Sequence, residues 1–205
     1  MSPEPVRVEP PRHHDHGTSL LRFADRALVV CPGCGGRALV APRPGLAAPK
    51  YFIEMLSRPH RLTCGGCGAI ADWTRERGHP GRVGGGPDGA EDPFFRRPLW
   101  LQTRCAGRVL WAYDEKHVDA LAAYVGARLR ERHASPTAAM FARLPAWMKS
   151  AARRDEVLAG LTTLRALADR SAPADRSDAA HERGDTSCPH CSAPTRSLRR
   201  SPRAR

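Results

Sequence analysis

Two cysteine motifs of the same form constrain the fold of this chain more than any other feature. Cys31-Pro-Gly-Cys34-Gly35 and Cys64-Gly-Gly-Cys67-Gly68 each lie between short runs of strand-forming residues, which predicts a β-hairpin with the cysteines in its tight turn. Glycine after the second cysteine lets the turn close in a left-handed conformation while backbone N–H groups point at the sulfur atoms. The first cysteines of the two motifs are 33 positions apart, so the sequence predicts two matching hairpins.

The four cysteines of these motifs have the spacing and chemistry of a zinc site. Four thiolates surround a zinc ion tetrahedrally and leave it no open position, so we expect one structural ion. The 29 residues between the motifs exceed the simplest four-cysteine pattern, but a longer loop costs only about 0.6 kcal/mol per doubling of its length. The alternatives are unmetallated free thiols or redox dithiols, although a redox pair begins a helix and these lie in β-turns. The predicted ligands are Cys31, Cys34, Cys64 and Cys67.

The other three cysteines leave alternatives open. Cys105 is interpreted as a buried small hydrophobe, an additional metal ligand, or a nucleophile paired with His117, and the first role is the usual one for a lone cysteine. Cys188-Pro-His-Cys191 lies in a Ser-, Pro- and Arg-rich stretch, which favours a solvated thiol pair over a redox motif. A second zinc site there would need His181 or His190 as its third ligand, and no fourth ligand is apparent.

The rest of the sequence predicts an α+β fold with a third hairpin and C-terminal helices. Residues 98–103 and 108–113 are strand-like runs, and Gly107 between them can supply a positive φ. Apolar residues at helical spacing predict helices at 114–132 and 152–169, with a short helix at 136–143. The predicted organisation is a disordered arm at 1–19, a zinc ribbon at 20–77, a flexible loop at 78–93, a hairpin and helices packed on the ribbon at 94–170, and a disordered Arg-rich tail at 171–205.

Net charge is the main indication of a partner. The chain carries 33 basic and 21 acidic residues, a formal charge of +12, of which +10 belongs to residues 20–170. Such an excess favours a polyanionic partner such as nucleic acid. The clusters Arg96-Arg97, Arg128-Arg130-Arg132 and Arg153-Arg154 form a binding surface only if the fold brings them onto one face; each alone is typical of a solvated surface.

Several other classes of protein are excluded by the sequence. No apolar run approaches the roughly 20 residues of a membrane-spanning helix, and the N-terminal stretch lacks the apolar segment of a signal peptide, so we expect a cytoplasmic protein without a membrane partner. Paired carboxylates and an open metal site are not apparent, and the run at 84–86 lacks the strand and helix of a phosphate-binding loop. We therefore expect no enzymatic activity.

The two cysteine motifs within paired hairpins resemble zinc ribbons of the transcription-factor-IIB type. That resemblance covers residues 27–74 and implies a small three-stranded sheet, four zinc ligands and, commonly, binding to nucleic acid or to polymerase assemblies. Residues 98–132 and 143–158 are similar to bacterial zinc-ribbon proteins of unassigned function that carry the ribbon before an α+β body.

Two functions follow as hypotheses from these features. The first is a nucleic-acid-associated or transcription-related accessory protein whose arginines contact phosphates. The second is a zinc-stabilised protein–protein interaction module without catalytic activity, which would use the ribbon or the two helices against a protein or a second copy of the chain.

Overall fold

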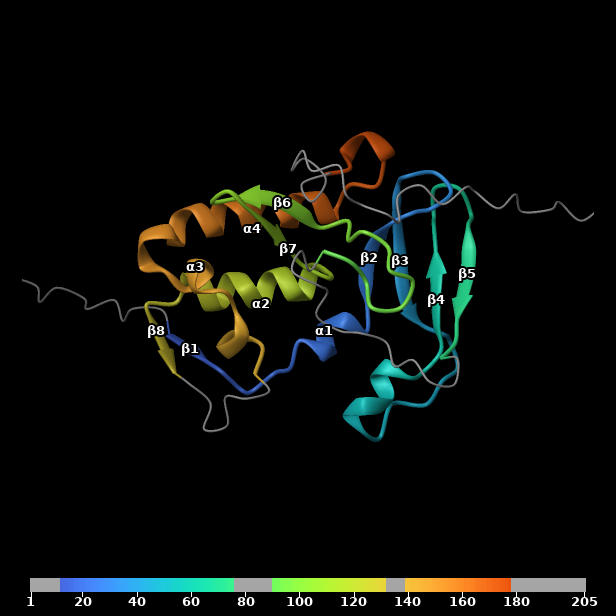
Figure 1. Ribbon diagram of the computed structural model, residues 1–205, viewed down its shortest axis with the longest axis horizontal. Helices are drawn as coiled ribbons and strands as arrows, with labels where there is room; N and C mark the ends of the chain where they lie inside the picture. Colours follow the sequence, from blue (N-terminus) through green and yellow to red (C-terminus); the bar gives the residue numbers. More distant parts are fainter. Residues whose placement is uncertain (1–11, 76–89, 132–138, 178–205) are drawn as a thin grey trace, which may run out of the picture.

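The structure is a computed structural model that describes residues 12–75, 90–131 and 139–177. It confirms the mixed α+β class: an antiparallel sheet forms one side of the molecule, and two long helices and a separate hairpin form the other (Figure 1). Most of the predicted loop at 78–93, the start of the predicted helix at 136–143 and the tail from 178, with Cys188 and Cys191, lie outside the described residues.

The two cysteine motifs connect the strands of one four-stranded antiparallel sheet. Its strands lie in chain order, so each motif joins neighbouring strands, as the repeated hairpins predict. The resemblance to zinc ribbons implied three strands, whereas each motif here is flanked by strands on both sides and the sheet has four. The strands are β2 (Ala27–Val30), β3 (Arg37–Pro42), β4 (His60–Thr63) and β5 (Ile70–Trp73).

Strand β2 is buried on both faces and contributes to two hydrophobic cores. Leu28 and Val30 point to the core shared with the helices, whereas Ala27 and Val29 point to a second core that includes Phe94 and Leu62. The alternation follows from the two-residue period of a strand. An uninterrupted apolar run such as Ala27–Val30 is what a strand covered on both faces requires.

Hydrogen bonds also occupy both edges of β2. Strand β3 pairs with one edge, and residues 98–100 pair with the other, through Val30 N–H to the Pro98 carbonyl at 2.9 Å and Trp100 N–H to the Leu28 carbonyl at 2.8 Å. Residues 98–100 therefore extend the sheet and do not belong to the third hairpin, whose strands are β6 (Gln102–Cys105) and β7 (Arg108–Trp111). The predicted positive φ at Gly107 is confirmed, but the turn is shorter than the predicted connection at 104–107, because Arg104 and Cys105 belong to β6. Ala106 and Gly107 have φ values of 53° and 71°, as a two-residue hairpin turn of the primed type requires.

Helix α2 (Glu115–Gly126) begins at the predicted N-cap, where the Asp114 side chain accepts the His117 N–H at 2.9 Å. The prediction that it continues to Arg132 is wrong. The Arg130 guanidinium folds back and donates to the carbonyls of Tyr124 and Val125, which satisfies the end of the helix there. The following residues form strand β8 (Leu129–Glu131).

Strand β8 pairs in parallel with β1 (Arg12–His14), so the predicted disordered arm is also corrected: residues 12–19 are ordered. His13 packs edge-on against the rings of Tyr124 and Phe141, at centroid distances of 5.5 and 4.8 Å. These are contacts between residues more than 100 positions apart, which no local pattern in the sequence indicates.

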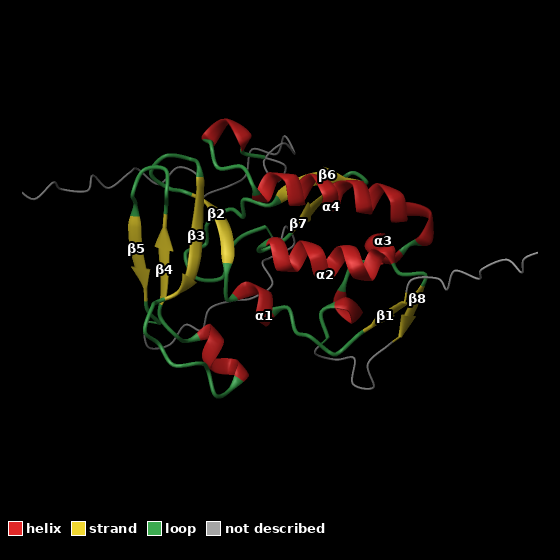
Figure 2. Ribbon diagram, turned by 180° about the vertical axis from the view of Figure 1, so that it is seen from behind, coloured by secondary structure: helices red, strands yellow, loops and turns green. Residues whose placement is uncertain are grey.

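The second long helix, α4 (Arg154–Ala168), confirms the helix predicted at 152–169 and packs against α2 and the β6–β7 hairpin (Figure 2). Its buried face includes Val157, Leu161 and Leu164. A side chain at Gly160 would lie 2.8 Å from Leu110, so the glycine permits the close approach of helix and hairpin. The shorter elements are helices α1 (Leu21–Ala24) and α3 (Ala146–Lys149) and 3₁₀ turns at Phe52–Leu56, Phe141–Arg143, Ala151–Arg153 and Pro173–Asp175.

His117 is enclosed where the two halves of the molecule meet. Its ring stacks between Phe23 and Tyr113, at centroid distances of 4.7 and 5.7 Å, and its Nδ1 accepts the Tyr113 N–H at 3.2 Å. Burial lowers the pKa of this imidazole to about 3, so the ring is neutral in the folded protein at physiological pH.

Acidification is expected to destabilise the protein through His117. The unfolded chain takes up a proton at the ordinary histidine pKa of about 6.5, whereas the folded ring stays neutral down to a pKa of about 3, so stability present above pH 6.5 is lost as the pH falls. Between pH 7.5 and 5.5 this loss is about 1.4 kcal/mol. Denaturant unfolding with saturating zinc should show a loss larger by this amount for the wild type than for His117→Gln. Equal losses in the two proteins would contradict this assignment.

Candidate metal centre

The fold brings the four predicted ligands together. Their sulfur atoms all lie within 4.8 Å of one another, and the closest pairs each join the two motifs: Cys31 to Cys67 at 3.6 Å and Cys34 to Cys64 at 3.7 Å. A disulfide would need about 2.05 Å, so the four cysteines are free thiols. Zinc–sulfur bonds of about 2.3 Å place two sulfurs of a tetrahedral site about 3.8 Å apart. The sulfur cluster therefore has the dimensions of a site for one metal ion.

The two cysteine turns have the same backbone geometry. In each, the glycine after the second cysteine has a positive φ, 74° at Gly35 and 72° at Gly68, and its N–H donates to the carbonyl of the first cysteine at 3.0 Å. Residues without this conformational freedom would strain both turns. The repeated sequence motif thus forms the same turn twice. Each turn directs its two cysteine sulfurs toward the same place, where the four sulfurs cluster.

Burial differs among the four ligands in a way that follows from their positions. Cys31 directly follows strand β2 and Cys64 directly follows β4, and both are buried, with 2% and 4% of their surface exposed. Cys34 is half-buried and Cys67 is exposed. The site thus has one side fixed in the second hydrophobic core and another open to solvent, from which an ion can enter.

The electrostatics of the site favour loss of the first proton from Cys64. Burial opposes the charge, but the backbone N–H groups of Cys67 and Gly66 and the neighbouring thiols lower the pKa of Cys64 to about 7. Burial raises the pKa of Cys31. A divalent cation compensates the accumulating negative charge of the remaining thiolates, so metal binding releases protons and weakens in acid.

The C-terminal segment covers the first cysteine turn, a contact that sequence reasoning missed. The Ser171 carbonyl accepts the Arg37 N–H at 3.1 Å, and the Arg37 guanidinium donates to the carbonyl of Ala168 at the end of α4. A side chain at Gly36 would lie 2.7 Å from the Ser171 oxygen. The second motif has Ala69 at the corresponding position. This Gly-for-Ala difference between the repeats is the one sequence signal of the contact.

Residues 171–177 were predicted to belong to a disordered tail, and the structure corrects this. They form the 3₁₀ turn Pro173–Asp175 beside Gly35 and Gly36. The predicted helix and the metal site are therefore joined by the chain that follows α4.

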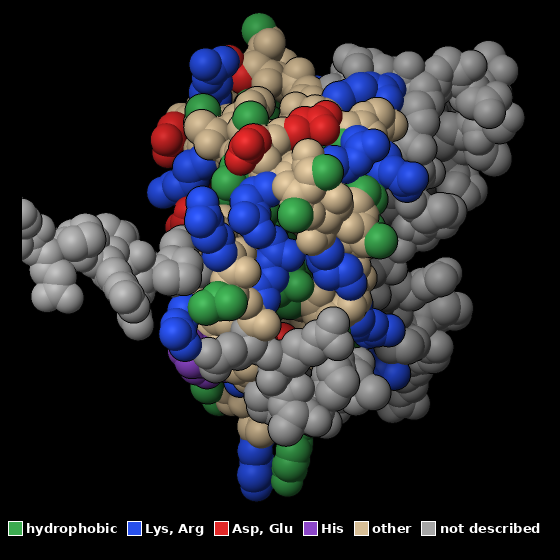
Figure 3. All heavy atoms as spheres, turned by 90° about the vertical axis from the view of Figure 1, so that its left-hand side faces the viewer, with side chains coloured by type: hydrophobic (Ala, Val, Ile, Leu, Met, Phe, Trp, Pro, Cys, Tyr) green, Lys and Arg blue, Asp and Glu red, His purple; other side chains and the backbone are tan. Residues whose placement is uncertain are grey.

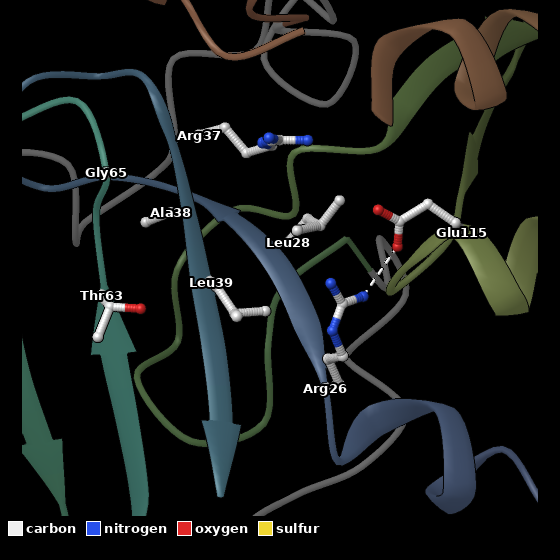
Figure 4. A pocket seen from close by; sticks show the side chains of 8 residues that line it. All are labelled: Arg26, Leu28, Arg37, Ala38, Leu39, Thr63, Gly65 and Glu115. Atoms are coloured by element: carbon white, nitrogen blue, oxygen red, sulfur yellow. Dashed lines mark hydrogen bonds and ion pairs between the residues drawn. The ribbon is translucent and has the colours of Figure 1, made fainter. Parts of the chain in front are cut away.

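A cavity of about 230 Å³ lies between the ribbon sheet and the start of α2 (Figure 4). Its two arginines already have partners: Arg26 donates to Glu115 at 2.8 Å and Asp114 at 3.3 Å, and Arg37 donates to Ala168. We interpret the cavity as part of the polar contact between the β2–β5 sheet and the helices α2 and α4, and not as a ligand site. Its lining consists of Arg26, Leu28, Arg37, Ala38, Leu39, Thr63, Gly65 and Glu115.

Cys105 belongs to the hydrophobic core shared by the hairpin and α4. Its sulfur lies 3.6 Å from the Glu156 carbonyl, and burial raises the pKa of its thiol. His117 makes its ring contacts and its Nδ1 hydrogen bond elsewhere, so the geometry supports the interpretation of Cys105 as a buried small residue.

Comparisons of the chain with protein-family models, with curated protein sequences and with solved structures found no match. No helix among the described residues is long and apolar enough to cross a bilayer.

Gly36→Ala is expected to destabilise the protein by about 1–3 kcal/mol, because the added methyl overlaps the Ser171 carbonyl. Denaturant unfolding measures the loss, and amide exchange should show faster opening of residues 168–177. Gly65→Ala is the matched control, since Gly65 lies in the second turn with no atom within 4 Å of an added methyl. Equal stability of the two variants would show that the C-terminal segment does not rest on the first turn.

Proposed function

We propose that the protein binds one zinc ion at Cys31, Cys34, Cys64 and Cys67. The sulfur–sulfur distances of 3.6 and 3.7 Å support zinc because they match the edges of a tetrahedral thiolate site. Four protein ligands leave no position for a substrate, so the ion is structural and not catalytic. The role that we propose for the protein is likewise not enzymatic.

We also propose that the protein is a nucleic-acid-associated accessory protein of the cytoplasm, related to transcription. The observation that supports it is the charge of +10 on residues 20–170, which excludes the terminal segments 1–19 and 171–205. Arginines supply most of this charge, and their planar guanidinium groups suit bidentate contacts with phosphate.

Removal of a single ligand should abolish stoichiometric zinc binding. Cys31→Ser and Cys67→Ser each leave three thiolates and should lose the ion, and Cys31→Ser should also destabilise the helical half because Cys31 continues the shared strand β2. Elemental analysis of purified protein, with cobalt substitution to report tetrahedral thiolate ligation, measures the effect.

The control for this experiment is Cys105→Ser, which removes a buried thiol outside the cluster and should retain one zinc per chain. Undiminished zinc in either ligand variant would refute the metal assignment.

Binding to nucleic acid should be strong at low salt and weaken steeply as salt rises. Each phosphate that the protein neutralises on duplex DNA contributes about −0.9 to the slope of log K against log salt concentration. Fluorescence anisotropy with labelled duplex DNA and RNA, titrated between about 50 and 200 mM salt, measures the slope. An absence of detectable binding at the lowest salt would overturn the nucleic-acid proposal.

A protein partner is the second candidate, and the outer edge of β5 favours it. Ile70 on this strand is 67% exposed, and β5 pairs with β4 but with no other strand of the described residues. An extended segment of a partner could add to this edge by backbone hydrogen bonds. A stoichiometric partner that survives nuclease treatment and is lost with Ile70→Asp would favour this function over the first.

A further inference from the structure

We call the part of the protein formed by α2, α4 and the β6–β7 hairpin the helical half. Its end farthest from the β2–β5 sheet carries a concentration of basic side chains. It is formed by β1, β8, α3, the start of α4 and the tip of the β6–β7 hairpin, and it faces the viewer in Figure 3. We name it the basic end and define it by nine residues: Arg12, Arg104, Arg108, Arg128, Arg130, Arg143, Lys149, Arg153 and Arg154.

Contacts between segments distant in sequence assemble this end. Arg130 of β8 donates to the Lys149 carbonyl at 3.1 Å, which joins β8 to α3. Lys149 donates to the Ala142 carbonyl at 3.2 Å, and Arg12 lies opposite Leu129 in the β1–β8 pair. The hairpin tip is held to α4 by the Ala106 N–H, which donates to Glu156 at 2.7 Å. The described arginines of two of the three sequence clusters, Arg128 with Arg130 and Arg153 with Arg154, therefore meet on one surface.

Arg96 and Arg97, the third arginine cluster, are not part of the basic end. Arg96 pairs with Glu91 at 2.8 Å, and both arginines directly precede residues 98–100, which pair with β2 at the sheet.

The charge of the helical half is gathered at the basic end. Three acidic residues accompany the nine basic ones there: Glu131, Asp155 and Glu156. The other described residues from 90 onward have six basic residues and seven acidic ones, so they carry almost no net charge. The basic ones are Arg96, Arg97, Lys116, Arg165, Arg170 and Arg176, and the acidic ones are Glu91, Asp92, Asp114, Glu115, Asp119, Asp169 and Asp175.

Part of the basic end is structural and part faces solvent. Arg130 bonds three carbonyls and stacks over Tyr124 at 4.7 Å, so it shapes the surface and does not face a ligand. Arg108, Arg128 and Arg143 are exposed, and no acidic side chain within residues 12–75, 90–131 and 139–177 pairs with them. These three arginines supply the positive potential that a ligand meets first.

We propose that the basic end is the surface that binds nucleic acid and that it contacts the phosphate backbone of a duplex without reading its sequence; this rests on the nucleic-acid function proposed above. Exposed guanidinium groups come from three separate segments, which are the hairpin with Arg108, the turn after α2 with Arg128 and the 3₁₀ turn that ends at Arg143. Such a spread suits a duplex with phosphates on two strands. Phe141 is buried there, and Tyr124 under Arg130 and Trp147 of α3 are both half-buried, so no fully exposed aromatic ring among the described residues of this end offers a base a stacking platform.

An anionic membrane is the less suitable polyanion for this surface. Peripheral membrane binding combines basic residues with large apolar side chains that enter the lipid. Leu129, with 43% of its surface exposed, is the one exposed large apolar side chain among the described residues of the basic end. A surface so dominated by arginine is suited to phosphates in solution.

The test compares two triple variants of the full zinc-loaded chain that reduce the net charge equally. Arg108, Arg128 and Arg143 are changed to Gln in the first, and Arg22, Arg43 and Arg75, which are exposed outside the basic end, are changed to Gln in the second. Anisotropy against two duplexes of unrelated sequence and against vesicles of anionic lipid measures binding, and zinc content and thermal unfolding verify that each variant is folded.

The proposal expects wild-type protein to bind both duplexes with equal affinity. The basic-end variant should bind on the order of 100-fold more weakly at about 0.1 M salt, with a salt slope less steep by about 2.7, while the control variant changes little. Equal losses in the two variants, a strong preference for one duplex, or tighter binding to vesicles than to duplex would each overturn it. If the wild type binds neither duplex at low salt, the nucleic-acid function itself fails, which is a different result from binding that is insensitive to the basic-end variant.

Discussion

Strand β2 is the constraint on which the rest of the structure depends. Its two faces supply side chains to two cores, its two edges are hydrogen-bonded to β3 and to residues 98–100, and its next residue, Cys31, is a buried ligand of the candidate metal centre. A metal ion held by Cys31 therefore fixes the end of a strand that both halves of the protein share. For this reason the ion should stabilise the helices as well as the ribbon, although none of its ligands lies in a helix.

A second connection between metal centre and helices runs through the backbone that follows α4. The side chain of Arg37 donates to the Ala168 carbonyl, and its backbone N–H donates to the Ser171 carbonyl. The strand that follows the first cysteine turn is therefore hydrogen-bonded to the C-terminal end of α4. Position 36 needs a glycine because the Ser171 carbonyl lies where the Cβ of any other residue would be. The two cysteine turns, alike in backbone geometry, thus differ in role: the first supports the helical half and the second leaves Cys67 open to solvent.

Local features of the sequence predicted those parts of the fold that local chemistry determines. The cysteine turns depend on ligand type and on glycine at Gly35 and Gly68, and α4 depends on apolar spacing, so both could be derived from the sequence. The end of α2 could not, because the group that ends it is the side chain of Arg130, four residues beyond Gly126. The β1–β8 pair and the covering of the first turn involve partners more than 100 residues apart, and no periodicity encodes such contacts.

The position of the charge on the surface also could not be derived from the sequence, because it depends on contacts between distant residues. The fold shows where the arginines gather. An excess of arginine in a sequence is compatible with a uniformly basic surface, on which no site is distinguished. Here the turn after α2 and the pairing of β1 with β8 carry Arg128 to the end where α4 begins, while the remainder of the helical half is nearly neutral. Electrostatic attraction is screened over about 10 Å in 0.1 M salt, so a local concentration of charge matters more to a ligand than the total. The interaction that ends α2 therefore has a consequence beyond stability: Arg130 stays inside as the structural cation, and the exposed arginines beside it form the surface that a polyanion would meet.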